Sequence, residues 1–172
     1  SVLELEVDGE PVPFRQVVIE QANEADPERR LALERAQSEA VAERLTHERG
    51  AYRPNQYQNP HNPASHLKTT GPEIWRQTAG RITHFVAGAG TCGSITGTGR
   101  YLKSMNPDIK IIAADPEASV FSGGSGRPYL VEGVGEDFFP AAYDGDLWDE
   151  VIPISDEESF LTARYVSETE GI

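Results

Sequence analysis

The stretch that most constrains how this chain folds runs from His84 to Lys103. An apolar segment gives way there to closely spaced glycines and hydroxyl side chains, after which residues with helical character resume. Glycines allow a tight turn and let backbone N–H groups approach a ligand, and the helix that follows adds the partial positive charge of its N-terminus. The pattern predicts a strand, an anion-binding loop and a helix, with a phosphate ester as the expected ligand.

The spacing of these glycines leaves more than one reading open. Gly88, Gly90 and Gly93 form a G-x-G-x-x-G pattern after a predicted strand, and Asp115 ends the next predicted strand near the offset of a ribose-binding carboxylate. On these residues alone, a dinucleotide is the favoured ligand. A glycine-rich turn without any ligand is the plainer alternative, because short glycine motifs recur by chance.

Around the glycine loop the chain alternates predicted strands and helices. We expect strands over residues 82–86, 109–114 and 151–154, a helix over residues 94–104, and a last helix between Ser155 and Gly171. Ser155 and Glu158 have the spacing of a capping box at the start of that last helix. Successive strand–helix–strand units predict an α/β fold with a parallel sheet, and such sheets bind ligands beyond the carboxyl ends of their strands.

The first part of the chain has a different character. Residues 2–7 alternate apolar and acidic side chains before a turn signal at Asp8-Gly9, which predicts a short edge strand or an extended arm. Pro27 suits the start of a helix and Gly50 suits its end, so residues 28–48 predict one long charged helix. We expect an N-terminal arm and helix over residues 1–42 and an α/β domain over residues 43–172.

Composition limits the partners of the chain. Its 15 basic and 28 acidic residues give a formal net charge of −13, which disfavours nucleic acid and anionic membranes as partners. A single cysteine, Cys92, excludes an internal disulfide, and no apolar run approaches membrane-spanning length, so we expect a soluble cytoplasmic protein. The four histidines, among them His66, show no metal-ligand spacing, and we expect no metal site.

Several further motifs occur in a fixed order in the second part of the chain. They lie at residues 52–60, 69–75, 90–94, 115–117, 122–124 and 132–138. On these motifs the chain from about Val41 to Ile172 resembles the pyridoxal-phosphate (PLP) β-synthases, the group that contains cysteine synthase and cystathionine β-synthase. Residues 126–138 are more similar to the bacterial, haem-free cystathionine β-synthases. The resemblance implies part of the tryptophan-synthase-β-like fold (fold type II), PLP as cofactor, small amino-acid substrates, and a homodimer for the complete enzyme.

The resemblance assigns the glycine loop to the cofactor phosphate. The matching residues are Gly90, Thr91, Cys92, Gly93 and Ser94. Ser94 stands where the family usually has threonine, so a hydroxyl is retained, whereas Cys92 stands where the family usually has glycine. If residue 92 needs a positive φ, its Cβ adds strain of about 1 kcal/mol and weakens cofactor binding.

Residues of two other loops match the substrate side of the family's site. Gln56 matches a residue that helps to hold the substrate carboxylate, and Gly133, Val134 and Gly135 match a loop beside the cofactor ring. Three more residues belong to the part that varies with the second substrate and are candidates for recognising homocysteine: Tyr129, Glu136 and Asp137.

A lysine that binds the cofactor covalently has no match in this chain. The three lysines are Lys68, Lys103 and Lys110, and none lies in a motif of the family. We therefore assign no catalytic residue and expect the chain to be a partial β-replacement enzyme, by origin a fragment, a rearranged gene product or a chimera, that binds PLP weakly and turns over negligibly. The first hypothesis is a cystathionine β-synthase-like lyase that joins serine and homocysteine. Cysteine synthase, a noncatalytic interaction module and a dinucleotide-binding domain are the alternatives.

Overall fold

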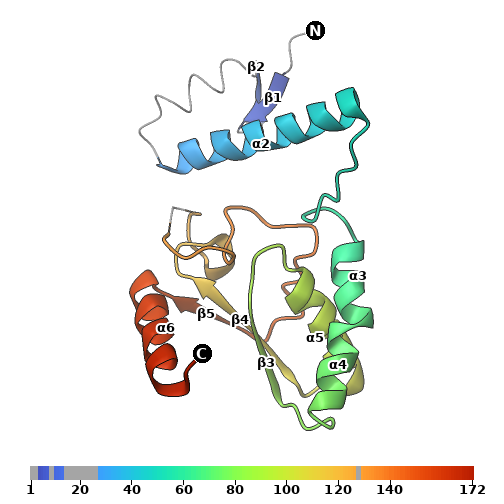
Figure 1. The fold of residues 1–172 in the computed structure, drawn as a ribbon, viewed down its shortest axis with the longest axis vertical. Coiled ribbons are helices and arrows are strands. Elements are labelled where there is room, and N and C mark those ends of the chain that lie inside the picture. The colour runs from blue at the N-terminus through green and yellow to red at the C-terminus, as the bar shows by residue number, and fades with distance from the viewer. Residues whose placement is uncertain (1–3, 8–9, 14–26, 127–128) are drawn as a thin grey trace. The chain divides into compact units, whose positions relative to one another are not determined.

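The computed structural model describes residues 4–7, 10–13, 27–126 and 129–172. The chain divides into two compact units, Ser1–Pro54 and Asn55–Ile172 (Figure 1).

The first unit contains a hairpin and a long helix. Strand β1 (Glu4–Val7) pairs antiparallel with β2 (Glu10–Pro13), with Leu5 opposite Val12. Helix α2 (Pro27–Arg49) runs for 23 residues and ends at Gly50, whose φ of +59° suits glycine. The predicted edge strand and the long helix are both confirmed, while the turn expected at Asp8-Gly9 lies outside the described residues.

The second unit is built on a parallel sheet. Its strands are β3 (His84–Gly88), β4 (Lys110–Pro116) and β5 (Glu150–Ile154), in the order β3-β4-β5. Both pairings are parallel and in register, so that Val86 lies opposite Ile112 and Ala114 lies opposite Ile152. The predicted α/β fold with a parallel sheet is confirmed, and the strand bounds differ from those expected by one or two residues.

Helix α5 (Gly93–Met105) packs on one face of this sheet. Ile95 and Leu102 of the helix are fully buried together with Ile111 and Ala113 of β4. Because side chains alternate along a strand, the residues between them lie on the other face. There Val86 is 57% exposed and Ile152 40% exposed.

Two short helices, which the sequence pattern did not predict, pack on α5 (Figure 1). They are α3 (His61–Lys68) and α4 (Thr70–Gln77), each with a proline in its first turn. Neither is long enough to be stable alone. Close packing on α5 stabilises both, because a Cβ at Gly71 of α4 would overlap the ring of Tyr101, and one at Gly97 of α5 would overlap the backbone of Pro63.

An aromatic cluster joins the end of β4 to the segment that leads into β5. Phe121, in the 3-10 helix η1 (Val120–Ser122), is 8% exposed and packs against Phe139, Tyr143 and Trp148 with ring centroids 5.7, 5.5 and 5.5 Å away. Such pairs add specific stabilisation to the apolar area that they bury.

Helix α6 (Asp156–Glu170) follows β5. Ser155 and Glu158 form the predicted capping box, and Gly171 ends the helix with a φ of +71°. The Asp156 carboxylate accepts hydrogen bonds from the backbone N–H groups of Leu130 and Val131, at 2.9 and 3.3 Å. Among the described residues, no helix is both long and apolar enough to cross a membrane.

A candidate cofactor site

A cavity of about 560 Å³ lies at the carboxyl end of β3, where the sheet fold predicts a ligand. The structure places every residue of the predicted phosphate loop and substrate side in its lining. These are Gln56, Gly90, Thr91, Cys92, Gly93, Ser94, Gly133, Val134 and Gly135. Residues from three separate parts of the chain therefore meet at one cavity.

The first wall of the cavity is the start of α5. Gly93, Ser94 and Ile95 form the first turn of this 13-residue helix, and all three line the cavity. The first N–H groups of a helix have no partner within it and carry its positive dipole end. This wall therefore offers backbone donors to an anion.

Two glycines in this wall are required by close contacts. A Cβ at Gly93 would overlap the side-chain amide of Asn62, and one at Gly90 would come within 3.3 Å of the Gly133 carbonyl oxygen. The loop can adopt its shape only because these side chains are absent.

Cys92 occupies a left-handed conformation, with φ +63° and ψ 1°, immediately before α5. The positive φ that is the condition for strain at residue 92 is therefore present, at a cost of about 1 kcal/mol. The thiol is 3% exposed and donates to the carbonyl oxygen of Gly90 at 3.4 Å. Burial, together with the carboxylates of Glu136 and Asp115, raises its pKa to about 12, so the thiol stays protonated at neutral pH and is a poor nucleophile.

Two hydroxyl groups extend from this wall, and each contacts a side chain of α3. Thr91 Oγ1 accepts a hydrogen bond from Asn62 Nδ2 at 3.1 Å and a longer one from the Gly93 N–H at 3.5 Å. Ser94 Oγ lies 3.2 Å from His66 Nε2.

The opposite wall is the loop over residues 131–136. The N–H of Gly135 donates to the Ala89 carbonyl oxygen at 2.6 Å, which joins this loop to the end of β3. Gly133 and Gly135 have φ values of +80° and +79°, a region that favours glycine. At Gly88, a Cβ would overlap the side chain of Val134, so the two walls are in close contact.

The second wall carries negative charge. Glu132 and Glu136 both line the cavity, and among the described lining residues there is no lysine, arginine or histidine. The Tyr57 hydroxyl hydrogen-bonds the Glu136 side chain, and burial together with this carboxylate raises the pKa of Tyr57. The pKa of Tyr129, also in the lining, is raised to about 12 by burial and by nearby carboxylates, Glu136 first among them.

Two of the remaining carboxylates lie outside the cavity lining. Asp137, expected near the second substrate, packs against Gly126 instead. Asp115, the candidate ribose ligand, is 1% exposed and accepts a hydrogen bond from Ser122 Oγ at 2.7 Å. The dinucleotide alternative requires an accessible carboxylate at this position to bind the ribose, and the buried Asp115 does not provide one.

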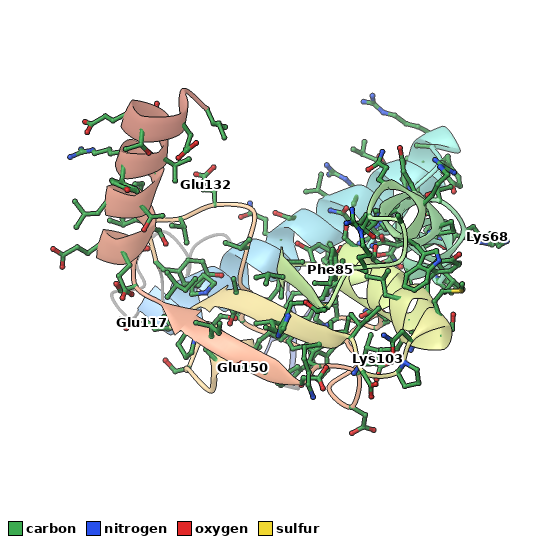
Figure 2. All side chains as sticks on the ribbon, turned by 90° about the horizontal axis from the view of Figure 1, so that it is seen from below. Lys68, Phe85, Lys103, Glu117, Glu132 and Glu150 are labelled. Carbon is green, nitrogen blue, oxygen red and sulfur yellow. The ribbon has the colours of Figure 1, made fainter. Side chains whose placement is uncertain are left out.

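None of the three lysines lines the cavity. Lys103 and Lys110 pair with Asp149 at 2.8 and 3.0 Å, and Lys68 lies in the last turn of α3. Figure 2 shows Lys68 and Lys103 on the side of α3 and α5, away from Glu132.

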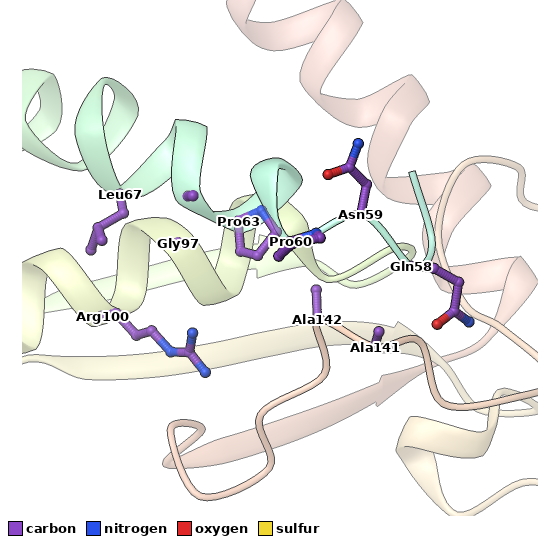
Figure 3. Close-up of a pocket in the computed structure, with 10 residues that line it drawn as sticks. Gln58, Asn59, Pro60, Pro63, Leu67, Gly97, Arg100, Ala141 and Ala142 are labelled. Carbon is purple, nitrogen blue, oxygen red and sulfur yellow. The ribbon is translucent and has the colours of Figure 1, made fainter. Parts of the chain in front are cut away.

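A smaller cavity of about 250 Å³ lies between α3, α5 and the loop at Ala141 and Ala142 (Figure 3). Arg100 borders it, and this guanidinium is paired with Asp144 at 2.7 Å. None of the predicted site residues lines this cavity. Among the described residues, no group of histidine, cysteine and acidic side chains is arranged to hold a metal ion.

Comparison with known proteins shows which family the chain belongs to. A model of the family described as "Pyridoxal-phosphate dependent enzyme" matches residues 17–172. The chain belongs to this family. The match begins before Val41, where the recognisable motifs start.

Similarity to individual proteins supports this family assignment. Cysteine synthase 3 of Caenorhabditis elegans is 41% identical over 119 residues, which are 69% of this chain and 35% of the relative. A cysteine synthase of Staphylococcus aureus is 40% identical over 133 residues, 76% of this chain and 43% of the relative. The solved O-acetylserine dependent cystathionine beta-synthase from Helicobacter pylori superposes with a TM-score of 0.71 at 32% identity, covering 84% of this chain and 52% of that one. The chain thus spans less than half the length of these two curated relatives.

The cofactor of this family is PLP, and the cavity fits its phosphate. A wall of helix N–H groups, two hydroxyls and glycines that could carry no Cβ is a suitable anion site. The sequence patterns missed Asn62, His66 and Tyr57. The spacing of Asn62 and His66, four residues apart, would have placed both on one face of a helix had that helix been predicted.

Proposed function

We propose that this cavity is the cofactor and substrate site of a PLP-dependent β-replacement enzyme. The observation that supports the proposal most directly is the meeting of the α5 N-terminus with the glycine loop over residues 133–135. In the proposed site, Gly90, Thr91, Cys92, Gly93 and Ser94 hold the phosphate through backbone N–H groups and hydroxyls. Bound PLP withdraws electrons from the α-carbon of an amino-acid substrate, so that its β-substituent can be exchanged.

The other residues in the lining bind and orient the substrate. The Gln56 amide donates to the substrate carboxylate. Gly133, Val134 and Gly135 would present their backbone to the cofactor ring. The close contact between Val134 and Gly88 holds this loop against β3.

We infer that the second substrate is an amino-acid thiol. The lining contains the carboxylates of Glu132 and Glu136 and, among described residues, no cationic side chain. This field attracts an ammonium group and repels a small anion such as hydrosulfide. It favours the reaction of a cystathionine β-synthase, in which serine or O-acetylserine and homocysteine form cystathionine. The similarity to the O-acetylserine dependent cystathionine beta-synthase from Helicobacter pylori supports this proposal.

Cysteine synthase, which uses O-acetylserine and sulfide, is the second candidate, and the names of the curated relatives favour it. The two are separated by supplying the whole protein with O-acetylserine and either homocysteine or sulfide. A higher kcat/KM with homocysteine supports the first candidate. A higher kcat/KM with sulfide overturns it in favour of the second.

The 172-residue chain by itself is proposed to turn over negligibly, because none of its lysines lines the cavity. Robust cystathionine formation by the isolated chain would contradict this. We further propose that the whole enzyme is a cytoplasmic homodimer.

Cofactor binding tests the site itself. Pyridoxine 5′-phosphate, which has no aldehyde to react with surface lysines, should bind the chain saturably, while pyridoxine without phosphate should not. Absence of phosphate-dependent binding would favour the alternative of a noncatalytic interaction module.

A further inference from the structure

We propose that Asn62 and His66 are positioning residues that turn the two hydroxyls of the phosphate loop into hydrogen-bond donors toward the cofactor phosphate. The inference rests on the proposed function, because it assigns a role to helix α3 in the same site. It concerns residues that do not line the cavity.

The close packing of α3 on α5 sets the geometry. A Cβ at Gly93 would overlap the Asn62 amide, and a Cβ at Gly97 would overlap the Pro63 carbonyl and the His66 Cβ. The absence of side chains at Gly93 and Gly97, four residues apart on α5, leaves room for Asn62 and His66, four residues apart on α3. Helix α3 therefore presents two polar side chains directly behind the phosphate loop.

Asn62 determines the direction of the Thr91 hydroxyl. Asn62 Nδ2 donates to Thr91 Oγ1 at 3.1 Å and to the Gln56 carbonyl oxygen at 2.9 Å. The Gly93 N–H is a further, longer donor to Thr91 Oγ1 at 3.5 Å. Because a hydroxyl oxygen has two lone pairs and one proton, an oxygen that accepts at both lone pairs can only donate in the remaining direction. Thr91 lines the cavity, so that proton is available to an anion bound there.

His66 does the same for Ser94. His66 Nδ1 lies 2.9 Å from Thr70 Oγ1, and His66 Nε2 lies 3.2 Å from Ser94 Oγ. We assign the tautomer in which the Thr70 hydroxyl donates to Nδ1 and the ring proton on Nε2 is donated to Ser94 Oγ. The Ser94 proton is then free to donate to the phosphate. The contacts thus form a chain from Thr70 through His66 to Ser94.

The site contains no cationic side chain among its described lining residues, so it holds a phosphate only with neutral donors. Hydrogen bonds to a charged acceptor are the stronger kind, and losing one costs about 10-fold or more in affinity. Support from α3 is therefore expected to affect cofactor affinity although α3 lies outside the cavity.

The test uses the whole 172-residue chain and pyridoxine 5′-phosphate, with the dissociation constant and the ³¹P chemical shift of the bound phosphate as readouts. His66→Leu should weaken binding about 10-fold and shift the ³¹P resonance, and His66→Gln, whose side-chain amide can still donate to Ser94, should restore much of both. His61→Leu removes an exposed histidine from the same helix and should change neither. Circular dichroism verifies that each variant is folded.

A double-mutant cycle tests whether His66 acts through Ser94. In a Ser94→Ala background, His66→Leu should cost little further affinity, and Asn62→Ala should likewise cost little in a Thr91→Val background. Additive losses in both cycles would overturn the inference, as would a His66→Leu variant that binds like the wild type. If the wild-type chain itself shows no phosphate-dependent binding, the proposed function fails along with the inference.

Discussion

The backbone N–H of Gly135 donates a hydrogen bond to the carbonyl oxygen of Ala89 at 2.6 Å, and this contact joins the two walls of the cofactor cavity. Ala89 is fully buried at the end of β3, whereas Gly135 belongs to a loop with little regular structure. The loop is therefore positioned by a rigid strand.

Substitution of Gly135 should separate side-chain overlap from simple backbone strain. In Gly135→Ala, a Cβ would meet the Tyr129 hydroxyl and the ring of Pro116, in addition to the penalty at a φ of +79°. Gly133→Ala is a matched control, because its φ is +80° and nothing lies within 4 Å of a Cβ there. We expect the control to lose about 1 kcal/mol of unfolding free energy and Gly135→Ala to lose clearly more, measured by denaturant unfolding. Equal losses would contradict this account.

Cys92 should be a strained position that glycine relieves. Both Cys92→Gly and Cys92→Ala remove the thiol, but only alanine retains a Cβ at a φ of +63°. We expect the glycine variant to exceed the alanine variant by about 1 kcal/mol in unfolding free energy and to bind pyridoxine 5′-phosphate more tightly. An alanine variant as stable as the glycine variant would show that the loop relaxes around the side chain.

The thiol itself should resist modification in the folded protein. Its pKa is raised to about 12 by burial and nearby carboxylates, against an ordinary value of 9.0. We expect iodoacetamide to label the chain slowly between pH 7 and 9, and rapidly once it is unfolded in guanidinium. Since the folded pKa is raised, the thiol contributes stability that is fully present below about pH 9 and is lost as the pH rises toward 12. Rapid labelling of the folded chain at pH 8 would contradict the assignment.

Asp149 should contribute to stability at neutral pH. Hydrogen bonds from Lys103 and from the Ile111 N–H are the largest causes that hold its pKa below the ordinary value of 3.8. The sign follows from the lowered pKa: the contribution is present above about pH 3.8 and is lost as the pH falls further. Asp149→Asn should lose about 1 to 2 kcal/mol at pH 7, and the difference from the wild type should shrink in acid. Asp146→Asn, at an exposed neighbouring position, is the control and should change little.

Strong local signals made most of the fold predictable from the sequence. The apolar run in β4, the glycines before α5 and the capping box at Ser155 each specify their element through nearby residues alone. The helices α3 and α4 could not be predicted in this way, because each has only 8 residues with a proline in its first turn. Contacts with α5 form them, and these contacts join residues distant in the sequence.

The same distinction applies to the site. Glycines and hydroxyls in one short stretch marked the phosphate loop, and the structure brings the predicted site residues to one cavity, with the exception of Asp137. The supporting residues Asn62 and His66 were missed because their partners lie 29 and 28 residues away in the sequence. Likewise, the G-x-G-x-x-G spacing alone suggested a ribose carboxylate at Asp115, and only its burial argues against that role.

The boundary between the two compact units falls after Pro54, and the phosphate loop, its α3 supports and the loop around Gly135 all belong to Asn55–Ile172. Limited proteolysis that cuts between the end of α2 and Asn55 would therefore release a smaller product with every residue of the cavity on one piece. Such a trimmed domain would be the natural starting point for crystallisation trials or isotope labelling.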